Sequence, residues 1–75
     1  MQAPAPQETS LSGCMVRTQY ILNFRASPGG DVIRAIPFNA TLTAVARTAD
    51  WFKVDFHGVK GWISADFVEP IGTCG

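Results

Sequence analysis

The chain has 75 residues, of which 47% are hydrophobic and 16% charged, a length and balance typical of one small folded domain and not of a disordered chain. Six basic and six acidic residues cancel, so no basic surface is available to attract nucleic acid or anionic lipid. No stretch approaches the roughly 20 apolar residues of a membrane-spanning helix, and we therefore expect no membrane span.

Residues 1–13 are predicted to be a flexible tail that precedes the folded domain at residues 14–75. The first ten residues are rich in Pro and polar side chains and have no periodicity, which favours an extended, solvated linker. Residues 11–14, Leu-Ser-Gly-Cys, are similar to a bacterial lipobox, but the basic start and apolar stretch of a signal peptide do not precede them. We therefore interpret the chain as part of a longer exported protein, with Met1 added for expression.

Short β-strands follow, because bulky apolar residues recur at every second position. The first strand region is predicted at residues 15–25, and further strands are predicted at 32–36, 41–47, 51–56, 59–63 and 68–70. Leu42, Ala44 and Ala46 are expected to face inward. No helical repeat of ten or more residues interrupts this pattern, so five or six strands are expected to form a small antiparallel barrel or sandwich.

The hairpin at residues 51–63 is the clearest local prediction. His57 and Gly58 separate its two strands, and both residue types are compatible with the positive φ angles of a two-residue hairpin turn. If Phe52 and Val54 face the core, Trp51 points to the opposite face of the strand. Trp62, on the returning strand, is expected to pack against the barrel.

Cys14 and Cys74 lie 60 residues apart, near the two ends of the predicted domain. They are either two free thiols or a disulfide, and we favour the disulfide because it joins the first and last strands, which are neighbours in a closed barrel. A disulfide indicates an oxidising, extracytoplasmic location, so the protein is expected to be secreted, periplasmic or at the cell surface. Two Cys and one distant His leave a metal site short of ligands, so no metal is expected.

Several blocks of this sequence resemble the bacterial SH3-like domain family. They are residues 22–29, Leu-Asn-Phe-Arg-Ala-Ser-Pro-Gly; 50–54, Asp-Trp-Phe-Lys-Val; 57–63, His-Gly-Val-Lys-Gly-Trp-Ile; and 64–68, Ser-Ala-Asp-Phe-Val. The resemblance covers about residues 17–70 in the family's order and spacing. Phe stands at positions 52 and 67 where the family usually has Tyr.

The resemblance implies an all-β, SH3-like barrel of five to six short antiparallel strands with one 3₁₀ turn near residues 64–67. It also implies a non-catalytic targeting module of an exported bacterial protein, which binds cell-wall peptidoglycan, as peptide or glycan. Two alternatives stay open. One is a protein-interaction or structural module that packs on a partner domain of a larger protein, and the other is a regulatory appendage of a hydrolase. We expect a monomer without a cofactor.

Catalysis by this chain itself is not expected. His57 is the single imidazole and lies at a predicted hairpin tip, where no neighbouring nucleophile or orienting group is evident.

The aromatic residues are the better candidates for a binding site. In an SH3-like fold Trp51 lies beside the 3₁₀ turn, where other exposed aromatic residues can join it. The predicted site is a shallow groove with acidic edges that would suit amines of wall peptides or a basic segment of a partner. Its residues are Trp51, Phe67, Tyr20, Asp31, Asp50 and Asp66. The alternative is that these aromatic side chains cover the core at the end of the barrel.

Overall fold

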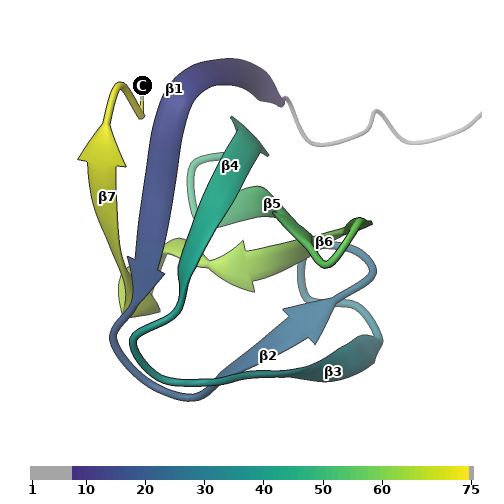
Figure 1. Ribbon diagram of the computed structural model, residues 1–75. Helices are drawn as coiled ribbons and strands as arrows, with labels where there is room; N and C mark the ends of the chain where they lie inside the picture. The colour runs from purple at the N-terminus through teal and green to yellow at the C-terminus, as the bar shows by residue number, and fades with distance from the viewer. Residues whose placement is uncertain (1–7, 75) are drawn as a thin grey trace, which may run out of the picture.

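The computed structural model describes residues 8–74, which contain seven β-strands, one short 3₁₀ helix and no α-helix (Figure 1). The elements are β1 (Thr9–Thr18), β2 (Leu22–Arg25), β3 (Val32–Ile36), β4 (Thr41–Arg47), β5 (Trp51–Phe56), β6 (Val59–Ser64), η1 (Ala65–Phe67) and β7 (Val68–Gly72). The predicted all-β class and the 3₁₀ turn are confirmed, with seven strands in place of five or six. Within the described range no helix is long and apolar enough to cross a membrane.

All neighbouring strands are antiparallel and follow the order β3-β2-β6-β5-β4-β1-β7. Figure 1 shows how the strongly curved sheet folds back on itself, with β2 and β3 crossing below β1 and β4. β1 pairs with β4 on one side and with β7 on the other. The first and last strands are therefore neighbours, as predicted. The two ends of the strand order, β3 and β7, do not pair with each other, so strand pairing leaves the curved sheet open there.

Two predicted boundaries differ from the structure. The predicted first strand at residues 15–25 is two strands, because the chain turns a corner at residues 19–21 between β1 and β2. The predicted tail at residues 1–13 extends too far, because strand pairing already begins where Thr9 lies opposite Arg47. Residues 1–7 of that tail lie outside the described residues. The pairing shifts register between Ser10 and Cys14, where Gly13 has a φ of 75°; a bulge of this kind leaves no alternating pattern in the sequence.

The core lies between the two folded-over halves of the sheet. Its largest fully buried side chains are Phe24, Phe52, Ile36, Ile63, Val16 and Val54. The predicted inner face of β4 is confirmed, since Leu42, Ala44 and Ala46 are all buried. Gly61 lets the ring of Phe24 approach the backbone of β6, because a Cβ atom at Gly61 would lie 2.6 Å from that ring.

The predicted hairpin turn between β5 and β6 is confirmed. His57 and Gly58 have φ angles of 52° and 83°, as a two-residue turn with positive φ at both central positions requires. The side chain of Asp55 accepts a hydrogen bond from the Gly58 amide at 2.9 Å. His57 is exposed at the tip.

The predicted disulfide between Cys14 and Cys74 is present, with a Cα–Cα distance of 4.9 Å. It joins β1 to the segment that follows β7, and both cysteines are buried. The bridge therefore fastens the two ends of the described chain at the side of the barrel where β1 and β7 already pair.

Candidate functional site

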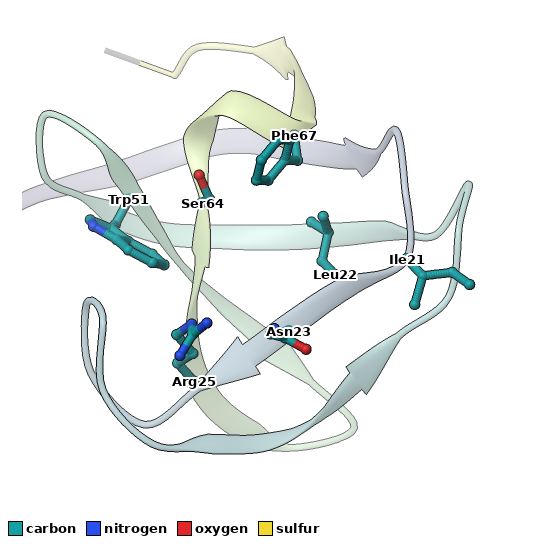
Figure 2. Close-up of a pocket in the computed structure, with 7 residues that line it drawn as sticks. All are labelled: Ile21, Leu22, Asn23, Arg25, Trp51, Ser64 and Phe67. Carbon is teal, nitrogen blue, oxygen red and sulfur yellow. The ribbon is translucent and has the colours of Figure 1, made fainter.

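A cavity of about 250 Å³ opens beside the 3₁₀ helix η1. The residues that line it come from the corner before β2, from β2 itself, from the start of β5 and from the end of β6 with η1. They are Ile21, Leu22, Asn23, Arg25, Trp51, Ser64 and Phe67 (Figure 2). The cavity is thus built by segments that are distant in the sequence and are brought together by the curvature of the sheet.

Backbone hydrogen bonds hold Trp51 next to η1. Trp51 pairs with Ser64 across the β5–β6 ladder. The amide of Ala65 donates to the carbonyl of Asp50 at 2.9 Å, and the hydroxyl of Ser64 accepts from the amide of Asp66 at 3.3 Å as the N-cap of η1. These bonds hold the backbone of Trp51 beside η1, and its half-buried side chain lines the cavity.

Phe67 forms the opposite aromatic wall, and Tyr20 packs against it. Their rings meet edge to face with centroids 5.7 Å apart, an arrangement that aromatic pairs favour. The amide of Gln19 donates to the carbonyl of Phe67 at 2.8 Å, which fastens η1 to the corner before β2. Phe67 is 46% exposed and Tyr20 is 61% exposed, so the pair presents apolar surface to solvent. Tyr20 itself does not line the cavity.

Arg25 supplies the positive charge of the cavity. Its guanidinium Nη1 donates to the carbonyl of Gly30 at 2.8 Å, and its side chain is half-buried. Figure 2 shows the guanidinium directed toward the space enclosed by Trp51 and Ser64. Among the described residues 8–74 no carboxylate lies within 4.0 Å of it, because the two ion pairs found there are Arg17–Glu69 and Lys60–Asp55.

The three predicted acidic residues are placed differently from the aromatic ones. Asp31, Asp50 and Asp66 are exposed, and none of the three lines the cavity. Asp50 and Asp66 directly precede Trp51 and Phe67, whereas Asp31 lies in the loop between β2 and β3. The structure therefore brings together the predicted aromatic residues and adds a cation where the sequence suggested an acidic edge.

Sequence reasoning missed five of the seven lining residues, namely the apolar Ile21 and Leu22 and the polar Asn23, Arg25 and Ser64. For the polar residues of β2 the sequence did hold a signal, because Leu22 and Phe24 are buried core residues and the residues between and after them must face the other way. Trp62, which was expected to pack, is only 6% exposed and lies under the ammonium group of Lys53 at 5.8 Å.

Within the described part of the chain, no group of three or more His, Cys, Asp or Glu side chains is placed to hold a metal ion. His57 packs against Phe56 with ring centroids 4.3 Å apart at the hairpin tip and does not line the cavity. The groups that do line it are aromatic and aliphatic side chains, one amide, one hydroxyl and one guanidinium. These groups are suited to holding a ligand by stacking and hydrogen bonding.

Comparison with known proteins agrees with this architecture. Residues 22–69 match the model of the family described as the bacterial SH3 domain. The chain is also 29% identical over 70 residues to YrvJ of Bacillus subtilis (strain 168), whose name describes a candidate N-acetylmuramoyl-L-alanine amidase. That alignment covers 87% of this chain but only 14% of the relative. The family match begins at the first residue of β2 and ends in β7, so it includes every lining residue except Ile21. This chain belongs to the bacterial SH3 domain family.

Proposed function

We propose that the domain is a non-catalytic targeting module of an exported protein and that it binds cell-wall peptide or glycan in the cavity between β2 and η1. The observation that carries this proposal is the cavity itself. Trp51 and Phe67 offer two aromatic surfaces, while Asn23, Ser64 and Arg25 offer polar groups directed at the same space. An apolar pocket with a few converging polar groups is the usual form of a small-ligand site.

The amidase relative supports the wall as the target. An N-acetylmuramoyl-L-alanine amidase, as the name states, acts on the amide bond between a muramic acid sugar and L-alanine. A binding domain in such a protein would hold the amidase close to the cell wall, where the amide bond that it cleaves is found. The Cys14–Cys74 disulfide also supports an extracytoplasmic location, because disulfides persist in oxidising compartments.

The composition of the cavity supports binding without catalysis. Neither His57 nor any cysteine lines it, and the Ser64 hydroxyl serves as the N-cap acceptor of η1. Covalent catalysis by that serine would need a base within hydrogen-bond reach. Any hydrolytic activity of a longer parent protein would then belong to another domain.

Co-sedimentation with isolated bacterial sacculi tests the proposal. We expect saturable pelleting of the domain that Trp51→Ala abolishes, because this change removes one wall of the cavity. Phe38→Ala is the matched control, since Phe38 is an exposed aromatic residue outside the cavity, and it should leave pelleting unchanged. The assay is repeated at low and moderate salt, because attraction between exposed charges alone would disappear as salt rises.

A protein-interaction role is the second candidate, and the outer strand β3 favours it. β3 is an edge strand, and Val32 and Ile33 on it and Phe38 in the following turn are all exposed. Exposed apolar residues beside an open strand edge are suited to packing on another domain. Absence of pelleting at both salt concentrations would contradict wall targeting and favour this second role, in which Phe38→Ala should weaken binding to the partner domain.

A further inference from the structure

We propose that the cavity recognises the free C-terminal carboxylate of a short peptide and that Arg25 is the residue that binds it. This inference rests on the proposed function, since it names the chemical group that the cavity would bind in a wall peptide. It also reverses the charge preference that the sequence suggested, because a cation and not an acidic edge lines the cavity.

The geometry of Arg25 favours an anionic ligand. A guanidinium has five N–H donors in a planar fork, and the hydrogen bond to the Gly30 carbonyl uses only Nη1. The bond to Gly30 orients the guanidinium group of Arg25. No carboxylate of residues 8–74 lies within 4.0 Å of this guanidinium. The remaining donors can hold a carboxylate through two parallel hydrogen bonds, which is the arrangement that arginine forms best.

The surroundings of Arg25 strengthen this contact. Its side chain is half-buried beside Trp51, so solvent screens a paired carboxylate less than it screens an exposed ion pair. Asn23 and Ser64 lie at the same cavity and can complete the hydrogen bonding of a terminal peptide unit. A ligand amine at this position would instead meet a positive charge that no described acidic group neutralises.

The size and apolar lining of the cavity favour the end of a chain. Its volume of about 250 Å³ lies just below the roughly 300–1,000 Å³ of sites for drug-sized ligands, so it has room for one or two small residues. Leu22, Trp51 and Phe67 supply an apolar surface for a small side chain such as a methyl group. A terminal residue can place both its carboxylate and its small side chain in the cavity. An internal acidic residue would need additional room, because the peptide chain continues on both sides of it.

The test is a titration of the labelled domain followed by two-dimensional NMR. The probes are N-acetyl-alanyl-alanine with a free carboxylate, in both stereoisomers of its last residue, and the same peptides as carboxamides. N-acetyl-glutamyl-alanine carboxamide, which carries its carboxylate on a side chain, forms a third arm. Signals of the Asn23 amide and the Trp51 indole report on the cavity, and the backbone amide of Gly58, at the β5–β6 turn outside the cavity, is the internal reference.

We expect at least one free acid to bind on the order of tenfold more tightly than its carboxamide and than the side-chain acid, because a charge-assisted hydrogen bond is lost in the carboxamide. Equal binding of acid and carboxamide, tighter binding of the side-chain acid, or no shift at Asn23 and Trp51 would overturn the inference.

Two matched variants assign the effect to one residue. Arg25→Gln should remove the preference for the acid, whereas Arg34→Gln should keep it, because Arg34 lies on the neighbouring strand β3 outside the cavity and near the ring of Phe56. A preference that survives in a folded Arg25→Gln variant would contradict the role of Arg25. If that variant does not fold, the comparison of acid with carboxamide on the unmodified domain still decides whether the cavity prefers a carboxylate. A shift of the Arg25 Nε–H signal when the free acid is added then decides whether Arg25 binds it.

Failure of this inference can be told apart from failure of the proposed function. Pelleting with sacculi that Trp51→Ala abolishes, together with equal binding of acid and carboxamide, would retain the wall-binding role and reject the carboxylate. Preference for the free acid without pelleting would reject the wall and keep the cavity as a site for the chain end of another peptide.

Discussion

Asp55 accepts hydrogen bonds from two groups near the turn between β5 and β6, from Lys60 Nζ at 3.1 Å and from the Gly58 amide at 2.9 Å. The bond from Lys60, followed by the bond from Gly58, lowers the pKa of Asp55 below its ordinary value of 3.8. A carboxylate with a lowered pKa stabilises the folded state above the unfolded pKa, and this contribution is lost as the pH falls through the folded pKa. The hairpin should therefore weaken in acid.

Asp55→Asn tests this charge effect, because asparagine keeps an oxygen acceptor for the Gly58 amide and loses the negative charge. We expect the unmodified domain to have the higher melting temperature at pH 5–7 and the difference to shrink as the pH falls below about 3.8. Thermal unfolding followed by circular dichroism across pH 2–7 measures it. Lys60→Gln should show a smaller pH dependence of the same sign, because it removes the ion pair but keeps the hydrogen bond from the Gly58 amide to Asp55. A difference that is constant with pH would contradict the role of the ion pair.

At the scale of single residues, the sequence predicted that Trp51 and Phe67 lie beside the 3₁₀ helix, but it did not predict that Tyr20 lies outside the cavity or that a cation lines it. Trp51 and Phe67 could be assigned to the cavity because strand alternation and the family pattern both place them next to the 3₁₀ turn. Alternation with Leu22 and Phe24 indicates on which face of β2 Arg25 lies, but the position of its guanidinium depends on a hydrogen bond to the Gly30 carbonyl, in a loop whose course no periodicity reveals. Asp50 and Asp66 were wrongly expected at the cavity. Each directly precedes an aromatic residue that lines the cavity, but neither aspartate lines it.

At the scale of elements, β3 and β6 lie where strands were predicted, although β3 buries only Ile36 and β6 buries three residues in succession. Alternation predicted β4 and β5 well, because every second residue is buried over most of their length. It failed at the corner between β1 and β2. Residues 20–25 continue to alternate across that corner, yet Tyr20 is exposed while Leu22 is buried, because the chain changes direction at residues 19–21 and the inward face changes with it. The start of β1 was missed because residues 9–13 are mostly polar and small and lie in a strand through pairing with β4.

The Cys14–Cys74 bridge is expected to provide much of the stability of the β1–β7 pair. In the chain-entropy account, closing a loop of 60 residues stabilises the folded state by about 4 kcal/mol, while a domain of this size has a total stability of roughly 5 kcal/mol. The double variant Cys14→Ala with Cys74→Ala should therefore be close to unfolding at room temperature.

Urea denaturation followed by tryptophan fluorescence, which reports on Trp51 and the buried Trp62 together, measures this loss. The unmodified domain treated with a reducing agent is the control and should lose a similar amount. A double variant that unfolds at nearly the same urea concentration as the oxidised domain would show that strand pairing holds β7 against β1 without the bridge.

At the scale of the whole molecule, the domain has a net charge of zero and a cavity of about 250 Å³. Neither feature favours tight binding, because long-range attraction is weak without net charge and a small cavity allows few contacts. The amidase relative is a much longer protein, of which the matched segment is only 14%, and a targeting module would act within a chain of that kind. A weak module can still hold such a protein on a polymer that repeats its ligand many times.

Two copies of the domain joined by a flexible linker should therefore be retained by sacculi far more strongly than one copy. A linked second site binds at a high effective concentration, which raises overall affinity by on the order of 100-fold or more when both sites can be occupied. Co-sedimentation over a range of protein concentrations measures the gain.

The control is a tandem of equal length with Trp51→Ala in one copy. This tandem keeps the mass and the linker but has one intact cavity, and it should bind like the single domain. Equal retention of the two tandems would mean that sacculi bind the chain through a surface other than the cavity, because only the cavity differs between them.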